Sequence, residues 1–207
     1  PGLFTVKMRI GFEDTQNFEA ILNLVNKHGI DLLSVHGRTV KEKYRSQVHY
    51  ESIKTAVEIC DCPVLANGDV SSALRSREIL NYTGAAGVMI GRHAIRNPWI
   101  FSQIREYEST GRIRRIPLQE VFLYVHSLYD ALKKPWITDK AHVNKMKKFL
   151  NFIGQGVDPD GQFIFQARRA QSERELFEIS DRFMISGSER YFADEPYEGL
   201  VARPNCE

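Results

Sequence analysis

The sequence predicts an α/β fold of four parallel βα units, followed by a small α-helical domain. Short apolar or β-favouring runs recur four times in the first half, and each is followed by an amphipathic helical pattern. Beyond residue 117 the strand signals nearly vanish, and helical stripes replace them. Strands alternating with helices pair in parallel, and we expect the sheet to be buried on both faces. We place the first domain at residues 1–112 and the helical domain at 113–207.

The first domain is expected to alternate strands and helices. The strands are predicted at residues 3–9, 31–36, 62–66 and 86–90. The first helix should have Asp14 or Thr15 as its N-cap and should end before Gly29. Further helices are predicted at about 49–59, 71–80 and 97–110, the last capped by Asn97.

The helical domain is expected to contain three amphipathic helices and a tail. Apolar stripes run from Leu118 to Leu132 and from Val143 to Ile153. A capping-box sequence, Ser172-Glu-Arg-Glu175, precedes the third helix. Residues 186–207 contain several glycines and prolines, which favours an irregular tail.

Composition excludes a secreted mini-protein, a membrane-spanning protein and a Cys-rich zinc module. A chain of 207 residues that is 43% hydrophobic and 26% charged can bury an ordinary core. No apolar run approaches the roughly 20 residues that span a bilayer, and the first residues lack a signal-peptide pattern. Three cysteines (Cys60, Cys62 and Cys206) are too few for a disulfide framework. We therefore expect a cytoplasmic protein without a metal site, and the strand-like start of the chain suggests a piece of a longer protein.

Polar residues follow each predicted strand. The carboxyl ends of parallel strands meet at one edge of a sheet, where such folds bind ligands. The residues at these ends are Lys7 and Arg9, His36 and Arg38, Asn67 and Asp69, and Gly91 with Arg92. Four successive strand ends of this kind predict a binding site at that edge.

The last two strand ends predict a phosphate site. Glycine lets backbone N–H groups approach an anion, and Arg92 adds a forked donor. The alternative is that Gly68 and Gly91 serve only tight turns. In (βα)₈ barrels the phosphate site is frequently formed by the loops after strands seven and eight. On this reading the chain is the C-terminal half of a TIM barrel, beginning at the fifth strand.

Several segments together resemble the second half of a tRNA-dihydrouridine synthase. They are Val6-Lys-Met-Arg9, Val35-His-Gly-Arg-Thr39, Pro63-Val-Leu-Ala-Asn-Gly-Asp-Val70, Gly87-Val-Met-Ile-Gly-Arg92 and Asn97-Pro-Trp-Ile-Phe101. The resemblance implies an FMN-dependent oxidoreductase that reduces uridine in tRNA to dihydrouridine, with NADPH as reductant. It implies that Lys7 and His36 contact the flavin ring, and that the phosphate is held by Asn67, Gly68, Asp69, Gly91 and Arg92. Arg9 and Arg38 would lie near the flavin or the tRNA, and we assign Arg38 to the substrate.

The chain departs from this family in one respect. The family's general acid is a cysteine in an Asn-x-Gly-Cys-Pro loop, and the sequence has no such motif. We therefore assign no catalytic residue, expect that cysteine in a missing N-terminal half, and expect the isolated chain to be inactive. Cys60 and Cys62 lie at the wrong end of a strand and are expected to be structural. Half a barrel would also leave two sheet edges open, to be covered by the missing half or by a second copy.

The second half of the chain has a basic character that suits RNA. Residues 111–190 carry 14 Lys and Arg against 10 Asp and Glu. We expect Lys145, Lys147 and Lys148 to contact tRNA phosphates, the alternative being a solvated helix face. Two other functions stay open: a different FMN-dependent TIM-barrel oxidoreductase, or a non-catalytic RNA-binding fragment.

Overall fold

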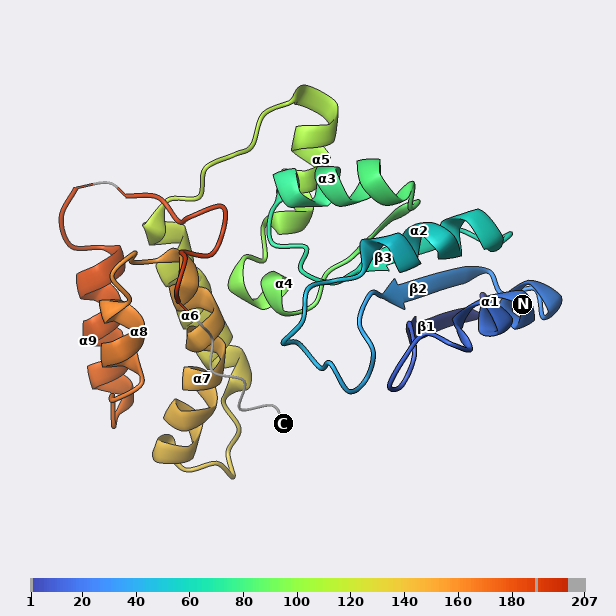
Figure 1. Ribbon diagram of the computed structural model, residues 1–207. Coiled ribbons are helices and arrows are strands. Elements are labelled where there is room, and N and C mark those ends of the chain that lie inside the picture. Colours follow the sequence, from blue (N-terminus) through green and yellow to red (C-terminus); the bar gives the residue numbers. More distant parts are fainter. Residues whose placement is uncertain (1, 189, 201–207) are drawn as a thin grey trace. The chain divides into compact units, whose positions relative to one another are not determined.

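A computed structural model describes residues 2–188 and 190–200 of the chain (Figure 1). The chain forms two compact units, Pro1–Gly91 with Ile100–Gly111, and Arg92–Trp99 with Arg112–Glu207. Residues 92–99 therefore group with the helical part of the chain, whereas the boundary that we placed at residue 112 assigned them to the first domain. Cys206 lies outside the described residues.

The first unit contains a four-stranded parallel sheet in the order β1-β2-β3-β4, which confirms the predicted α/β class. The strands are β1 (Thr5–Arg9), β2 (Leu32–His36), β3 (Val64–Asn67) and β4 (Gly87–Met89). The helices of this unit are α1 (Phe18–Lys27), α2 (Tyr50–Ile59), α3 (Ala73–Thr83) and α5 (Ile100–Thr110).

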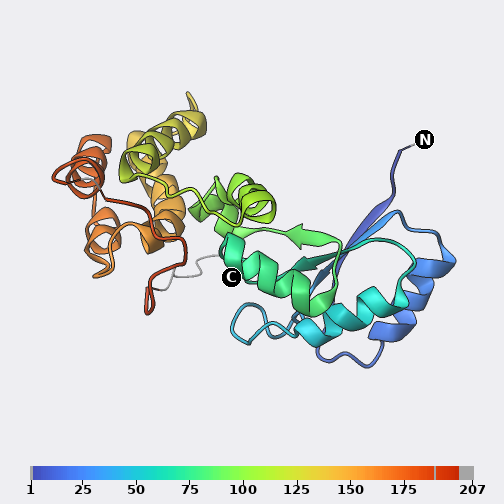
Figure 2. The ribbon, with the colours of Figure 1, turned by 90° about the horizontal axis from the view of Figure 1, so that it is seen from above.

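The sheet has one apolar and one polar face. Side chains alternate along a strand, and the parallel register aligns Lys7 with Ser34, and Arg9 with His36 and then Asn67. The alternate residues, such as Leu33 and Val35, belong to the core that includes residues of α1, α2 and α3. These helices lie on one side of the strands in Figure 2. We expected the sheet to be buried on both faces. In the described residues this holds for most positions of β2 and β3, whereas Lys7 of β1 is exposed.

Local capping decides where these helices begin. Ser72 Oγ accepts a hydrogen bond from Arg75 N (3.0 Å), so α3 begins at Ala73, and Gly84 ends it with a φ of 70°. The predicted N-cap of α1 is wrong, since Asn17 precedes the helix and Asp14 instead accepts a bond from Gln16 N. The helix predicted at 97–110 begins only at Ile100, because Asn97 Oδ1 accepts a bond from Trp99 N and forms a turn.

The second unit is built from helices. They are α4 (Arg92–Arg96), α6 (Leu118–Leu132), α7 (Asp139–Ile153), the 3₁₀ turn η1 (Gly154–Gly156), α8 (Gln162–Ala167) and α9 (Glu173–Met184). The predicted stripes of α6 and α7 form its core, with Val125, Met146 and Leu150 almost fully buried. The helix α8 and the short α4 were not predicted from the sequence.

The segment after α9 packs closely on this unit as far as the described residues reach. Phe192 is buried against Gly156, and Tyr191 forms a bridge with Pro117. The buried guanidinium of Arg96 donates to the carbonyl oxygens of Ala193 and Asp194, and burial lowers the pKa of Arg96 to about 10. Between residues 190 and 200 the tail is thus irregular in structure, as expected, and it is held to the second unit by packing and hydrogen bonds.

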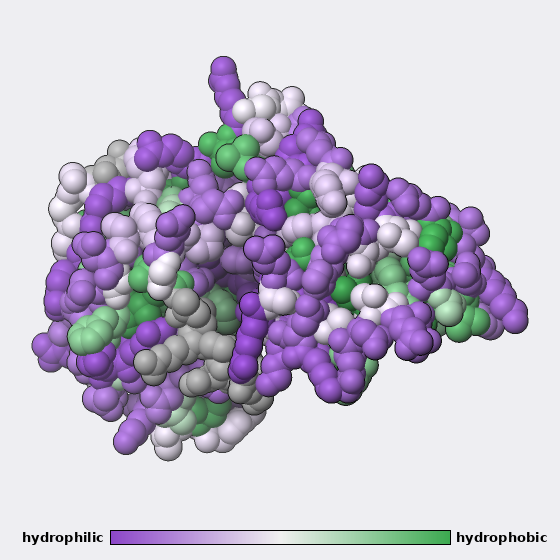
Figure 3. Space-filling view, in the orientation of Figure 1, coloured by the Kyte–Doolittle hydropathy of each residue, from purple (hydrophilic) through white to green (hydrophobic). Residues whose placement is uncertain are grey.

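The described helices include none that is long and apolar enough to traverse a bilayer. Figure 3 shows a largely hydrophilic face on which hydrophobic residues form separate patches.

Candidate functional site

The polar face of the sheet gathers the predicted cofactor residues of the first unit. Lys7, His36 and Asn67 project from the same face of β1, β2 and β3, because they occupy positions of the same parity in the register. Lys7 is exposed, whereas His36 is only 5% exposed. The site therefore combines an accessible ammonium with a buried imidazole.

His36 is held neutral. Burial is the main cause that lowers its pKa to about 4; the nearby charges of Arg9, Arg38 and Lys7 act in the same direction, and the Asp69 carboxylate opposes them. Its Nδ1 atom is buried and has no hydrogen-bond partner among the described residues. A buried polar atom without a partner costs free energy that a ligand's polar group can recover. The imidazole is thus prepared to bind a polar ligand.

The predicted phosphate turn follows β3. Gly68 has a φ of 130° and Asp69 a φ of 44°, so the chain reverses sharply there. Asn67 Nδ2 donates to Met89 O on β4 at 2.7 Å, so the side-chain amide links the ends of β3 and β4. The Asp69 carboxylate would repel a phosphate, so backbone N–H groups are what this turn can offer an anion.

Arg38 makes its bonds inside the protein. The side chain is 3% exposed, and its two terminal nitrogens donate to the Asp69 carboxylate at 3.1 and 2.5 Å. Nε donates to the carbonyl oxygen of Ser46 at 2.8 Å. All three nitrogens are therefore engaged, and the predicted contact between Arg38 and the substrate gains no support from this geometry.

The loop between β2 and α2, residues 37–49, is tied to the same face. Arg9 Nη1 donates to the carbonyl oxygens of Thr39 (2.7 Å) and Lys43 (3.1 Å), and its guanidinium lies 5.3 Å from the ring centroid of Tyr44. Arg9 thus supports the loop from β1.

The same loop contains a carboxylate–imidazole pair that sequence reasoning missed. Glu42 Oε1 lies 2.7 Å from His49 Nε2, and Glu42 Oε2 accepts from Thr39 N. The bond with His49 is the main cause that lowers the pKa of Glu42 to about 2, and Glu42 in turn raises the pKa of His49. No sequence spacing indicated this pair, because the fold of the loop alone brings the two side chains together.

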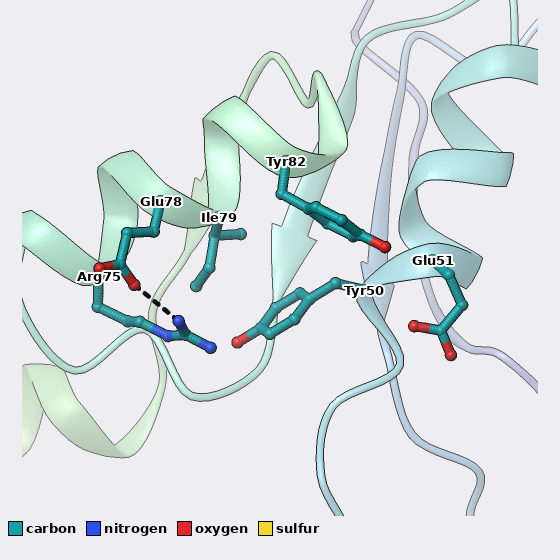
Figure 4. Close-up of a pocket in the computed structure, with 6 residues that line it drawn as sticks. All are labelled: Tyr50, Glu51, Arg75, Glu78, Ile79 and Tyr82. Atoms are coloured by element: carbon teal, nitrogen blue, oxygen red, sulfur yellow. Dashed lines mark hydrogen bonds and ion pairs between the residues drawn. The ribbon is translucent and has the colours of Figure 1, made fainter.

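Tyr50 supports the phosphate turn from the helical side of the sheet. Its hydroxyl donates to Gly68 O at 3.0 Å. The ring also borders a pocket of about 330 Å³ between α2 and α3, lined by Tyr50, Glu51, Arg75, Glu78, Ile79 and Tyr82 (Figure 4). Arg75 points toward Tyr50 in this pocket and pairs with Glu78 at 2.7 Å. The mixed charges of the lining favour no anionic ligand there.

The other half of the predicted phosphate site is divided by the unit boundary. Gly91 is exposed and is the last residue of its segment in the first unit, and Arg92 begins α4 in the second. The structure describes each unit by itself, so phosphate binding by Gly91 and Arg92 stays a prediction.

The predicted RNA-binding lysines lie on α7 of the second unit. Lys148 is exposed, while Lys145 and Lys147 are half-buried. Lys147 Nζ donates to Asn144 Oδ1 at 3.2 Å, and Arg168 Nε donates to Asn151 Oδ1 at 2.7 Å. From residue 140 to 157 the sequence contains no acidic residue, so the acidic residue of α7 is confined to its first position, Asp139, and the rest of the helix carries cations and amides.

The described residues contain no cluster of His, Cys, Asp and Glu able to hold a metal ion. His126 stacks on Phe177 with a centroid distance of 3.8 Å, and His142 stacks on Tyr129. Both imidazoles therefore belong to the core of the helical unit.

The carboxyl edge of a parallel α/β sheet is where such folds commonly bind ligands, and in this chain that edge carries cations and a buried imidazole. The chain belongs to the dihydrouridine synthase family, since the family model described as "Dihydrouridine synthase (Dus)" matches residues 3–182. This membership confirms the resemblance seen in the sequence.

Relatives in several bacteria agree. A tRNA-dihydrouridine synthase B of Vibrio parahaemolyticus is 41% identical over 195 residues, which are 91% of this chain and 56% of the relative. A tRNA-dihydrouridine synthase B of Proteus vulgaris is 40% identical over 119 residues, 56% of this chain and 37% of the relative. A probable tRNA-dihydrouridine synthase of Rickettsia prowazekii is 36% identical over 130 residues, 62% and 40% of the two chains. The chain thus spans about half or less of the length of these relatives.

Proposed function

We propose that this chain supplies the flavin-holding half and the RNA-binding helices of an enzyme that reduces uridine in tRNA to 5,6-dihydrouridine. FMN would be the cofactor and NADPH the reductant. In this proposal the four βα units are the C-terminal half of a (βα)₈ barrel. The observation that carries the proposal is the polar sheet face, where the buried His36 has an unpartnered Nδ1 among Lys7, Arg9 and Arg38.

The residues of this face suit the ring of a flavin. FMN, when bound, would supply the hydride, and the protein would hold and tune it. The Lys7 ammonium would stabilise the negative charge of a reduced flavin, and the neutral His36 would give its free nitrogen to a polar atom of the ring. The low pKa of His36 keeps a second full positive charge off that position at neutral pH.

The phosphate of FMN would bind at the turn after β3. Gly68 has a φ that an L-residue rarely adopts, and Val48 fills the space where a Cβ would lie, so the contacts with an anion would come from the backbone N–H groups of the turn. Asn67 would act by fixing the ends of β3 and β4, because its amide is already bonded to Met89 O. Asp69 would contribute through its backbone. Gly91 and Arg92 would complete the phosphate contacts.

The proton for the substrate would come from outside this chain. Cys60 and Cys62 precede β3, at the end of the strand opposite Asn67. Burial raises the pKa of Cys60 to about 11, so its thiol stays protonated in an apolar setting. Because neither cysteine fits a general acid for the polar face, the isolated chain would be inactive.

The remainder of the barrel would cover what the sheet leaves open. In the described residues β1 pairs only with β2, and β4 pairs only with β3. Leu3, Phe4 and Phe12, which flank β1, are 84%, 61% and 64% exposed. Neighbouring strands of a completed barrel would use the free backbone groups and bury these side chains.

The lysines of α7 would bind the tRNA backbone. Lys145, Lys147 and Lys148 lie on a helix whose acidic residue, Asp139, is at its first position, and lysines of this kind neutralise phosphates without reading the base sequence. The helical unit would thereby orient the tRNA.

The test has a binding arm and an activity arm. The chain is titrated with FMN, and flavin fluorescence gives the affinity for wild type, His36→Phe and the exposed control Lys54→Gln. The chain is then co-expressed with the part of the V. parahaemolyticus relative outside the matched region, and dihydrouridine is measured in tRNA. We expect FMN binding that His36→Phe weakens at least tenfold, and dihydrouridine only in the combined protein.

Each alternative has its own outcome in this test. tRNA binding without flavin binding would indicate an RNA-binding fragment. Flavin binding without affinity for tRNA would indicate a different FMN-dependent oxidoreductase. Either outcome would refute the proposed reaction.

A further inference from the structure

The phosphate turn and the 37–49 loop meet at one side chain. Arg38 donates two hydrogen bonds to Asp69 of the turn and one to Ser46 of the loop. Its guanidinium is almost fully buried, whereas the Asp69 side chain is 43% exposed. A planar fork bonded to both oxygens of a carboxylate fixes direction as well as distance. Arg38 therefore sets where Asp69 lies relative to the loop.

The turn is a conformation that needs support. Asp69 has a φ of 44°, which is uncommon for a residue other than glycine, and it follows Gly68 at a φ of 130°. Such backbone states persist where the surroundings fix them. Here two side chains do so, since Arg38 holds the Asp69 carboxylate and Tyr50 holds the Gly68 carbonyl.

Backbone contacts complete the connection. Gly37 N donates to Asn67 O at 3.1 Å, and His49 N donates to Gly37 O at 2.7 Å. The side chain of Val48 also lies where a Cβ on Gly68 would be, at 2.9 Å. Both ends of the 37–49 loop, at Gly37 and at Val48, therefore contact the segment that contains the turn.

We propose that Arg38 is a positioning residue that fixes the Gly68–Asp69 turn to the 37–49 loop, so that the two segments are stabilised jointly. The functional consequence rests on the proposed function: the loop carries Lys41, Lys43 and Arg45, and the turn would receive the cofactor phosphate. Binding of a phosphate at the turn would then order the cationic loop, and RNA held by the loop would strengthen cofactor binding to the same degree. This role differs from the substrate contact that the sequence suggested for Arg38.

The first test needs no ligand. Backbone amide exchange is measured in the 207-residue chain for wild type, Arg38→Lys, Asp69→Asn and the exposed control Glu58→Gln, which removes one negative charge as Asp69→Asn does. Asp69→Asn keeps the shape of the side chain and removes its charge, so we expect the protein to fold. We expect both variants of the pair to raise exchange at least tenfold in the turn and also in residues 42–49, with α1 and α6 unchanged.

Two exchange results would overturn the proposal. If Asp69→Asn loosened the turn and left residues 42–49 as in wild type, the segments would be independent. If exchange rose equally in α1, Arg38 would serve general stability only.

The second test measures FMN affinity, and it separates failure of this inference from failure of the proposed function. If the wild-type chain does not bind FMN, the proposed function fails, and amide exchange still decides the inference. If wild type binds, we expect Arg38→Lys to weaken binding at least tenfold. Equal affinity in the two proteins would refute the positioning role.

A double variant distinguishes positioning from charge neutralisation. Arg38→Gln combined with Asp69→Asn removes both charges, so the repulsion between Asp69 and a phosphate is gone. A positioning role predicts that FMN affinity stays at least tenfold below wild type, because the fork is still missing. Recovery of wild-type affinity would show that Arg38 only neutralises Asp69, and would overturn the proposal.

Discussion

Replacement of Gly68 by alanine tests the conformation of the turn most directly. At a φ of 130° an added Cβ would lie 2.9 and 3.0 Å from the two γ carbons of Val48. Backbone strain of this type costs about 1–3 kcal/mol, and overpacking of a closely packed site costs a similar amount. The lower entropy of the unfolded alanine chain returns about 0.4–1 kcal/mol. We therefore expect Gly68→Ala to destabilise the first unit by about 2–4 kcal/mol.

Two other glycines provide matched controls. Gly84 has a φ of 70° and an added Cβ would lie at an ordinary 3.7 Å from Val57, so Gly84→Ala should cost only about 1 kcal/mol. Gly91 has neither a positive φ nor a neighbour within 4 Å, so Gly91→Ala should be within about 0.5 kcal/mol of wild type. Gly68→Ala thus combines backbone strain with a steric conflict, Gly84→Ala introduces backbone strain alone, and Gly91→Ala introduces neither.

The assay can report on the two units separately. Both tryptophans, at positions 99 and 136, belong to the second unit. Urea unfolding followed by far-ultraviolet circular dichroism reports on both units, whereas tryptophan fluorescence follows the second. Gly68→Ala should shift the dichroism transition and leave the fluorescence transition in place, and adding Val48→Ala should recover the steric part. Equal stability of Gly68→Ala and Gly91→Ala would refute the reasoning about the turn.

Three further predictions concern titration and packing. In an NMR titration the His49 ring should have a pKa above 6.5, and Glu42→Gln should move it back toward 6.5. The stabilisation of the folded state by protonated His49 is present below pH 6.5 and is lost as the pH rises through the pKa of the folded state. An unchanged pKa in Glu42→Gln would contradict the pairing. The His36 ring should stay neutral down to about pH 4. Because His36 protonates near pH 6.5 in the unfolded chain, the free energy of unfolding should be highest above pH 6.5 and should fall between pH 6.5 and 4. A measured pKa near 6.5 would contradict the burial of the ring. Gly156→Ala should destabilise the second unit by about 1–3 kcal/mol, as measured by tryptophan fluorescence in urea, because the new Cβ would lie 2.5 Å from the Phe192 ring. Phe192→Leu should reduce that penalty, and no penalty at all would contradict the packing.

The sequence was most informative where periodicity alone decides the geometry. Lys7, His36 and Asn67 were grouped because each ends a strand, and the parallel register does place all three on one face of the sheet. The three successive crossovers place α1, α2 and α3 on one side of the sheet, so only that side is covered by helices of the first unit (Figure 2).

Side-chain partners could not be predicted from the sequence. Arg38 follows His36 by two residues in a motif that suggested contact with the flavin or the tRNA, yet its bonds go to Asp69 and Ser46, at separations of 31 and 8 residues. Tyr50 carried no motif, and it supports Gly68 only because α2 begins beside the turn. Such pairings depend on how loops pack in three dimensions, which neither residue spacing nor hydropathy encodes.

The charge on the polar face of the sheet gives one further link between folding and function. Three cations, Lys7, Arg9 and Arg38, act on His36 against the single carboxylate of Asp69. Like charges close together on a partly buried face destabilise the fold, and an added anion relieves that repulsion. A bound phosphate or anionic flavin would therefore stabilise the first unit by more than its direct contacts, and this stabilisation would decrease as salt screens the charges. The charge balance of the polar face would therefore favour binding of the proposed anionic cofactor.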